Sequence, residues 1–229
     1  MHNWRIKIFY VVLGLIVIGI AKESIWTKPR FKLDDGARAK LAEMPGQIEL
    51  RFVSERIWDY KIINGELLLQ TMEEYRPGWD KGRQYIQFAD QVPKGLPMLQ
   101  GFRYYGPYRL SPDKSLMFLS LSSEKEEYYP KHFVIIRMEN KEVLYQGRTD
   151  NDIEDVAWSP DSSMVLVLEE SSRRSLSITG ILRILMAHPS QVSTYSLSVY
   201  DRKGTLLVST KVASGFVDGA GRVSWKDKN

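Results

Sequence analysis

The densest group of metal-ligand side chains in this sequence is the acidic run at residues 150–155, DNDIED. Calcium prefers oxygen ligands, and carboxylates at alternate positions, as at Asp150, Asp152 and Glu154, open a calcium-binding loop. Such a loop needs glycine at its sixth position to turn sharply, whereas Asp155 stands there. We therefore expect no metal site and interpret the run as the polar connection ahead of a strand.

Groups that could carry out catalysis are sparse. The histidines are His2, His132 and His188, and each stands without a neighbouring motif. The string at 212–215, VASG, lacks the first glycine of a serine-nucleophile elbow. No metal-binding histidine spacing, Walker loop or dinucleotide fingerprint occurs. Because the chain also contains no cysteine, disulfides, thiolate metal sites and a cysteine nucleophile are excluded. We expect a non-enzymatic protein without a cofactor.

An aromatic cluster is the best candidate for ligand recognition. Tyrosine is favoured at recognition sites because its ring buries a large apolar area while its hydroxyl reaches a polar partner. Aromatic residues are also common in strands for structural reasons alone. The predicted ligand-binding residues are Phe102, Tyr104, Tyr105 and Tyr108.

A segment at 175–189 has the apolar spacing of a helix and is ended by Pro189. Its apolar residues recur at i, i+3, i+4 and i+7, which places them on one helical face. Such a face can contact a partner protein or a membrane, or it can fold back over a sheet edge of its own chain. The predicted partner-binding residues are Ile178, Ile181, Leu182 and Leu185.

The charge distribution argues against nucleic-acid binding. The formal net charge is +4, with 32 basic and 28 acidic residues interspersed along the chain. Nucleic-acid binding requires a concentrated basic stripe that neutralises phosphates, and the sequence has none. We interpret the charges as a solvated surface.

The chain begins with a membrane-targeting pattern, in which Arg5 and Lys7 precede an uncharged run at 8–21. A helix rises about 1.5 Å per residue, so this run spans roughly 21 Å, less than the ~30 Å hydrocarbon core. By length it resembles the apolar region of a signal peptide. Cleavage near Ala21 would then release the remainder into the periplasm.

Tryptophans on both sides of this run favour an uncleaved anchor instead. Trp4 and Trp26 lie about 33 Å apart along a helix and match the interfacial aromatic pattern of a membrane span. The basic residues ahead of the span would keep the short N-terminus in the cytoplasm. We therefore favour a signal anchor at 1–26. The bulk of the chain is then expected outside the cytoplasm, in a bacterial periplasm.

The residues after the anchor change from a linker pattern to a strand pattern. Residues 27–46 read as a juxtamembrane linker with a short helix over 37–44, capped by Asp34 or Asp35. From residue 47 the apolar spacing is that of strands. Asn64-Gly65 is a hairpin signal because both turn residues must accept positive φ. The first predicted strands are Gln47–Val53, Trp58–Ile63, Glu66–Thr71 and Tyr85–Phe88.

The most informative feature is an internal repeat between 107–119, PYRLSPDKSLMFL, and 155–167, DVAWSPDSSMVLV. A weaker third copy follows Val223. Repeats of about 40–50 residues with several short strands are typical of propeller blades. The repeat is defined by Ser111, Pro112, Asp113, Trp158, Ser159, Pro160, Asp161 and Trp225.

Each repeat unit predicts strands joined by a turn at the Ser-Pro-Asp string. Proline presets φ at the second turn position, and the serine and aspartate side chains can bond local backbone groups. The string MVLVL at 164–168 is apolar throughout, as expected when neighbouring sheets cover both faces of a strand. The predicted strands are Leu116–Leu121, His132–Met138, Glu142–Gln146, Val156–Trp158, Met164–Leu168, Tyr195–Asp201 and Leu206–Thr210.

At these residues the sequence resembles the TolB-like β-propeller repeat, whose recurring string is an aromatic-Ser-Pro-Asp-Gly turn between strands. The resemblance covers about residues 105–229, and the usual glycine is replaced by Lys114 in one copy and Ser162 in the other. Closed propellers have about four to eight blades, more than the units visible here. The resemblance therefore implies a small or incomplete propeller, or one completed by self-association, with an interaction role. Residues 47–100 could supply one diverged blade.

Together these features predict a mostly β protein, a propeller-like array of antiparallel sheets preceded by one N-terminal helix. We expect a propeller-like domain at 47–229 with a helical insert at about 172–192. The expected function is that of a membrane-anchored, extracytoplasmic scaffold that binds another envelope protein. The alternatives are a small-molecule or glycan-binding domain and an enzyme with a site built from loops.

Overall fold

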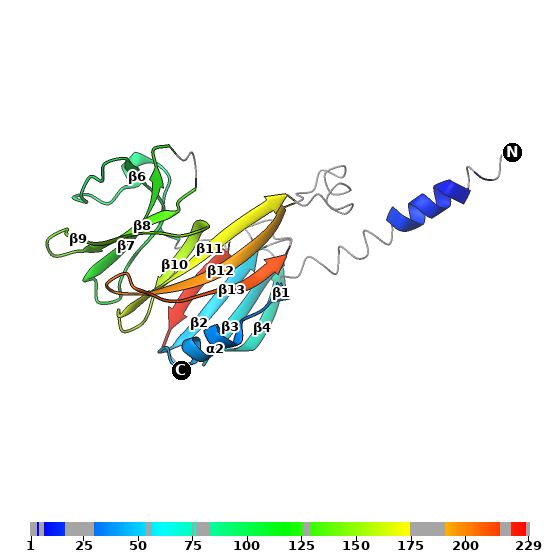
Figure 1. The fold of residues 1–229 in the computed structure, drawn as a ribbon, viewed down its shortest axis with the longest axis horizontal. Coiled ribbons are helices and arrows are strands. Elements are labelled where there is room, and N and C mark those ends of the chain that lie inside the picture. The colour runs from blue at the N-terminus through cyan, green and yellow to red at the C-terminus, as the bar shows by residue number, and fades with distance from the viewer. Residues whose placement is uncertain are drawn as a thin grey trace.

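The computed structural model describes residues 4, 7–16, 30–53, 56–74, 76, 83–125, 129–174, 191–215 and 221–227. They form a mostly β protein with three antiparallel sheets (Figure 1). The helical elements include α2 (Asp35–Ala42) and the 3₁₀ turn η1 (Ala89–Gln91). The strands are β1 (Arg30–Phe31), β2 (Gln47–Val53), β3 (Arg56–Ile63), β4 (Glu66–Glu74), β5 (Tyr85–Ile86), β6 (Phe102–Leu110), β7 (Leu116–Ser123), β8 (His132–Arg137), β9 (Val143–Arg148), β10 (Asp152–Trp158), β11 (Met164–Arg174), β12 (Gln191–Asp201), β13 (Leu206–Gly215) and β14 (Gly221–Lys226).

The first sheet has the strand order β14-β2-β3-β4, and the second sheet has the order β5-β6-β7-β8-β9. The middle sheet has the order β1-β13-β12-β11-β10 and packs between the other two. Within the described residues the sheets do not close into a barrel or a propeller ring.

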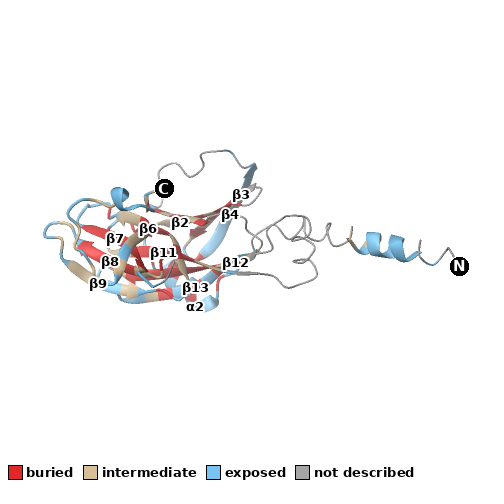
Figure 2. Cartoon of the chain, turned by 90° about the horizontal axis from the view of Figure 1, so that it is seen from above, coloured by how far each residue is buried: buried red, intermediate tan, exposed pale blue. Residues whose placement is uncertain are grey.

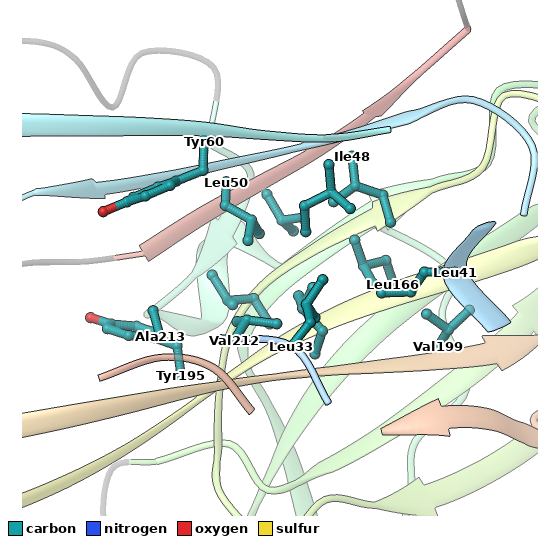
Figure 3. Close-up of a cluster of buried hydrophobic side chains, with 14 of the residues drawn as sticks. Leu33, Leu41, Ile48, Leu50, Tyr60, Leu166, Tyr195, Val199, Val212 and Ala213 are labelled. Carbon is teal, nitrogen blue, oxygen red and sulfur yellow. The ribbon is translucent and has the colours of Figure 1, made fainter. Parts of the chain in front are cut away.

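The middle sheet is buried on both faces, as the apolar string at 164–168 predicts. Leu166 and Leu168 join the core shared with the first sheet, whereas Val165 and Val167 join the core shared with the second sheet. Figure 3 shows the first of these cores, into which side chains of β2, β3, β11 and α2 point. Because alternate residues of a strand face opposite sides, only an all-apolar strand suits this position.

The three sheets meet along a common inner edge, formed by the edge strands β10 and β14 and by β6, which lies next to the short edge strand β5 of its sheet. Each sheet is built from consecutive antiparallel hairpins, except that β1 pairs with β13 in the middle sheet and the last strand, β14, pairs with β2 and completes the first sheet. β10 contacts both β6 and β14. This arrangement places one strand from each sheet at a common inner edge.

Residues 30–46 of the predicted linker are part of the folded domain. Asp34 caps α2, since its carboxylate accepts a hydrogen bond from the Ala37 amide at 2.8 Å. Ala37 and Leu41 are buried in the core between the first and middle sheets, and β1 pairs with β13. The domain therefore extends back to Arg30, and the predicted helix at 37–44 lies at Asp35–Ala42.

The hairpin predicted at Asn64-Gly65 is confirmed, with φ of 53° and 75° at the two turn residues. The strand predicted at 85–88 is shorter, at Tyr85–Ile86. The side-chain carbonyl of Gln91 accepts hydrogen bonds from the amides of residues 87 and 88, at 2.8 and 3.2 Å. This local bonding ends the strand and begins η1.

Two of the predicted features fall mainly on residues that the structure leaves undescribed. Residues 7–16 are helical, and among the described helices none has both the length and the apolar character to span a membrane. The remainder of the predicted anchor, at 17–26, lies outside the described residues. The predicted partner-binding segment at 175–189, with all four of its named residues, also lies outside them.

The two Ser-Pro-Asp strings form the same turn. The hydroxyls of Ser111 and Ser159 donate to the carboxylates of Asp113 and Asp161, at 2.5 and 2.6 Å. Each hydroxyl also accepts a hydrogen bond from the first amide of the following strand, at 3.0 and 2.9 Å. The tryptophan of the second copy, Trp158, donates its indole N–H to the carbonyl of Arg109, across to the second sheet. The repeat therefore encodes both a turn and a contact between sheets.

The tryptophan of the third copy, Trp225 on β14, has an equivalent anchoring bond. Its indole N–H donates to the Pro45 carbonyl at 2.6 Å. Gly46, the next residue, has a φ of 83°, and a Cβ there would come within 2.3 Å of the Lys226 carbonyl oxygen. Trp225 therefore ties the last strand to the turn that follows α2.

The turn places Lys114 and Ser162 in the left-handed region, with φ of 61° and 60°. Side chains other than glycine are strained in this region. Replacing the exposed Lys114 with glycine is expected to raise the free energy of unfolding by about 0.5–1 kcal/mol, less than the full strain because glycine gains chain entropy when unfolded. Urea unfolding of the wild type and the Lys114→Gly variant measures this difference.

A matched control is available in the second copy. The Ser162 hydroxyl accepts a hydrogen bond from the Asp113 amide at 3.1 Å, so Ser162→Gly relieves the same strain but removes a contact between turns. We expect little or no net gain there. A lower unfolding free energy for Lys114→Gly would contradict the explanation by strain.

Candidate functional site

The outward face of the second sheet is apolar and is covered by a loop. Met117, Leu119 and Leu121 of β7 form this face together with residues of β5 and β8. Side chains of the segment between η1 and β6 pack on it, from Val92, Leu96 and Leu99. β7 is thus buried on both faces, and its second face is removed from water by a loop instead of by another sheet.

Local hydrogen bonds hold the covering loop in place. The Tyr104 hydroxyl on β6 donates to the Pro97 carbonyl in the middle of the loop. The Phe102 amide donates to the Leu99 carbonyl at 3.2 Å. Gly101, with a φ of 78°, turns the chain from the loop into β6. The loop therefore has a defined conformation over the sheet.

A pocket of about 820 Å³ lies between this loop and strands β6 and β7. Small-molecule sites in proteins generally have volumes of about 300–1,000 Å³ and are lined mainly by apolar side chains. Lys94, Arg103 and Glu124 supply charged groups to the lining. The apolar lining includes Phe88, Val92, Leu96, Met98, Leu99 and Leu121.

Three of the four predicted ligand-binding residues line this pocket, namely Phe102, Tyr104 and Tyr105. Tyr108 does not line it, although it packs against the same apolar face of the sheet. Gly106, with a φ of 103°, lies where the pairing of β6 with β7 becomes irregular. This irregularity separates Tyr108 from the other three aromatic residues.

Two apolar side chains at the pocket are strongly exposed. Phe88 is 60% exposed and Met98 is 98% exposed. Such residues contribute little to the core, yet large exposed apolar groups around a concave surface commonly mark a binding site. They can contact an occupant without being needed for folding.

A second group of interest is a set of buried charges at the common inner edge. Asp155 on β10 is 1% exposed and lies 3.7 Å from the guanidinium of Arg109 on β6. Its other carboxylate oxygen accepts a hydrogen bond from the Val223 amide on β14 at 3.1 Å. One side chain of the middle sheet therefore contacts both neighbouring sheets.

The preceding residue, Glu154, lies where the pairing of β10 with β11 is irregular. Such a bulge redirects a side chain relative to the regular alternation of a strand. The guanidinium of Arg83 lies 3.1 Å from the Glu154 carboxylate and also donates to the Glu154 backbone carbonyl. The Nε of Arg83 is buried and has no hydrogen-bond partner within the described residues.

Burial controls the titration of these carboxylates. Desolvation raises the pKa of Glu154 to about 8, with Glu170 and Asp155 adding to the rise and Arg83 opposing it. Burial also raises the pKa of Asp155, Glu169 and Glu170 above the ordinary values. The cause is the same in each case, because a charged carboxylate is costly in an apolar interior.

The charged group and the pocket are connected by two tyrosines. The Arg83 guanidinium lies 4.8 Å from the centre of the Tyr85 ring. Tyr85 meets Tyr105 edge to face, with ring centres 5.8 Å apart, and Tyr105 lines the pocket. Contacts thus run from a buried carboxylate to the pocket wall.

Sequence reasoning placed the acidic run in a polar connection, whereas Asp152, Glu154 and Asp155 lie within β10. It did not single out Arg83, Glu169 or Glu170. One signal could have done so, because the glutamates directly follow the apolar string at 164–168, and charges that continue a strand covered on both faces must be buried. Within the described residues, no group of three or more acidic and histidine side chains is placed to hold a metal ion.

The fold and the pocket define the class as a mostly β protein of three antiparallel sheets, with a largely apolar pocket beside a loop. The sequence matches no protein-family model, and it has no match among curated proteins.

Proposed function

We propose that this protein acts by binding a small, mainly apolar molecule in the loop-covered pocket, without catalysing a reaction. The observation that carries this proposal is the pocket of about 820 Å³, with its largely apolar lining and its loop held over the sheet. Burying apolar surface contributes about 25 cal/mol per Å², which gives such a site an inherent affinity for apolar ligands.

The polar groups of the pocket narrow the ligand class. Lys94 and Arg103 are two cations against the single carboxylate of Glu124. An occupant with an apolar body and an anionic end would match this arrangement. A glycan fits less well, because sugars need many hydrogen-bond partners and the lining offers few.

We also propose that the sheets are blades of an incomplete propeller, as the TolB-like repeat implies. Three observations support this: the antiparallel hairpins within each sheet, the shared inner edge of β6, β10 and β14, and the completion of the first sheet by the last strand. An N-terminal anchor that keeps the domain outside the cytoplasm, at the membrane surface, remains part of the proposal. Its support is the uncharged run at 8–21.

A scaffold that binds an envelope protein, or a second copy of the chain, is the second candidate. One observation favours it: β4 is an edge strand of the first sheet and is exposed along much of its length (Figure 2). Leu68 and Met72 are exposed apolar residues on this strand. Exposed strand edges can accept an added strand from a partner.

The pocket proposal is tested with anilinonaphthalene sulfonate, a dye with an apolar body and an anionic group. We expect the folded wild type to bind the dye with a saturable fluorescence increase. Replacing Phe88 with alanine should raise the dissociation constant of the dye about fivefold, which corresponds to the loss of about 1 kcal/mol of apolar contact. The thermal midpoint should change little, because Phe88 is largely exposed.

The matched control is Tyr129→Ala, which removes an aromatic side chain that is 64% exposed and is not part of the pocket lining. This control should bind the dye as the wild type does. Each variant should keep the near-ultraviolet circular dichroism spectrum of the wild type, which shows that the dye is not binding to a state with loosened tertiary packing. Equal dye affinity for the wild type and Phe88→Ala would count against the pocket, whereas a scaffold acting through β4 predicts that equality.

A further inference from the structure

The wall of the pocket rests on a buried ion pair. Tyr105 lines the pocket, and its ring is supported by Tyr85. The Tyr85 ring lies against the guanidinium of Arg83, and the Glu154 carboxylate lies 3.1 Å from the same guanidinium. The pair is mostly shielded from water, since the side chains of Arg83 and Glu154 are only 17% and 19% exposed.

We propose that protonation of Glu154 weakens ligand binding in the pocket, acting through Arg83 and Tyr105. This inference rests on the proposed function and adds a regulation of the same site by pH. Glu154 would be a positioning residue, since it touches the pocket only through other side chains.

The physical reason is the loss of a counter-charge. With Glu154 ionised, Arg83 contacts both the carboxylate and the Tyr85 ring. When Glu154 is neutral, Arg83 keeps only uncharged oxygens of residue 154 as hydrogen-bond acceptors and has lost its counter-charge in a poorly solvated place. We expect the guanidinium to shift toward water, which withdraws support from Tyr85 and loosens the pocket wall.

The charged and titratable groups around Glu154 place this event near neutral pH. They come from the segment ahead of β5, from β5, and from strands β10, β11 and β12. The carboxylates of Asp155 and Glu170 raise the pKa of Glu154, whereas the guanidinium of Arg83 lowers it. The groups are Arg83, Tyr85, Asp155, Glu170 and Tyr195. Burial raises the pKa of Glu154 to about 8, so its protonation changes between pH 6.5 and 9.

The test is the dissociation constant of anilinonaphthalene sulfonate measured from pH 6.5 to pH 9. The sulfonate stays ionised throughout, so the probe itself does not titrate. We expect affinity to increase about fivefold or more from the low to the high end, the size of a typical coupling between sites. Glu154→Gln should bind more weakly than the wild type at high pH and show no pH dependence in this range.

Glu170→Gln is the matched control, because Glu170 is also a buried carboxylate but bonds to Ser193 instead of Arg83. It should keep the pH dependence, with its midpoint moved to lower pH because a repelling charge is gone. A measurement without variants is calorimetry of dye binding near pH 8 in two buffers of different ionisation enthalpy. Binding should release protons.

The outcomes separate this inference from the pocket itself. A wild-type affinity that is constant with pH, or a pH dependence retained in Glu154→Gln, would overturn the coupling while leaving the pocket in place. An absence of dye binding at every pH would overturn both. Proton release on binding, together with a constant affinity in Glu154→Gln, would support the coupling.

Discussion

Replacing Asp155 with alanine is expected to lower the free energy of unfolding by about 3–5 kcal/mol, the usual cost of removing one partner of a buried ion pair. Asp155 is almost fully buried on β10 and contacts the Arg109 guanidinium on β6 and the Val223 amide on β14. The substitution leaves a partly buried cation and a backbone amide without this acceptor, and it removes a side chain that links the three sheets. Chemical unfolding followed by circular dichroism measures the loss.

Two companion variants make this experiment specific. Asp155→Asn keeps an oxygen that can accept from Val223 but lacks the charge, so it should cost less than alanine. Asp150→Ala removes an exposed carboxylate from the same acidic run and should change stability by no more than about 0.5 kcal/mol. If Asp155→Ala lowers the free energy of unfolding no more than Asp150→Ala does, the contacts of Asp155 between sheets do not stabilise the fold.

The second large effect is a loss of stability as the pH rises from about 5 to 8. Burial raises the pKa of Glu154 to about 8, and it raises those of Asp155, Glu169 and Glu170. A raised pKa in the folded state means that the native protein binds more protons than the unfolded chain within this range. The free energy of unfolding must then fall with increasing pH. Each unit of pKa shift is worth about 1.4 kcal/mol, so Glu154 alone should account for a few kcal/mol.

Other carboxylates lower the stability of the domain at acidic pH. Hydrogen bonds from Ser111 and from neighbouring turn groups lower the pKa of Asp113 to about 2, and the same kind of bonding lowers that of Asp161. Their contribution is present above the ordinary aspartate pKa and is lost as the pH falls below about 4. The domain should therefore be most stable under mildly acidic conditions.

Urea unfolding at a series of pH values between 4 and 9 tests this expectation. The Glu154→Gln variant should show a flatter decline between pH 5 and 8, because one of the responsible groups no longer titrates. A stability that rises through this range, or an unchanged slope in Glu154→Gln, would contradict the proposed effect of burial. Asp150→Gln, an exposed carboxylate substitution, serves as the control.

Local features of the fold were predictable because they depend on neighbouring residues. The hairpin at Asn64-Gly65 follows from the need for positive φ, and the position of β2 at Gln47–Val53 follows from its alternation. The turn after Ser111 and Ser159 closes through bonds within a few residues. The two-sided burial of 164–168 follows from its apolar string.

The candidate site was predictable only in part. The aromatic residues Phe102, Tyr104 and Tyr105 are predicted as ligand-binding because they cluster in the sequence, and they line the pocket. The covering loop and its tether to Pro97 could not be read from the sequence, because the tether depends on how β6 lies relative to the loop. The role of Arg83 could not be predicted either, because its partner Glu154 lies on β10, 71 residues away in the sequence.

By itself, the sequence determined the mostly β character, the positions of most strands and the repeated Ser-Pro-Asp turn, because these depend on residue types over short distances. Only the tertiary structure decided that β14 completes the first sheet, that Asp155 of the acidic run is buried, and that a loop lies beside a pocket. These features arise when strands distant in the sequence are brought together. The resulting burial and pKa shifts belong to the assembled sheets and not to any one segment.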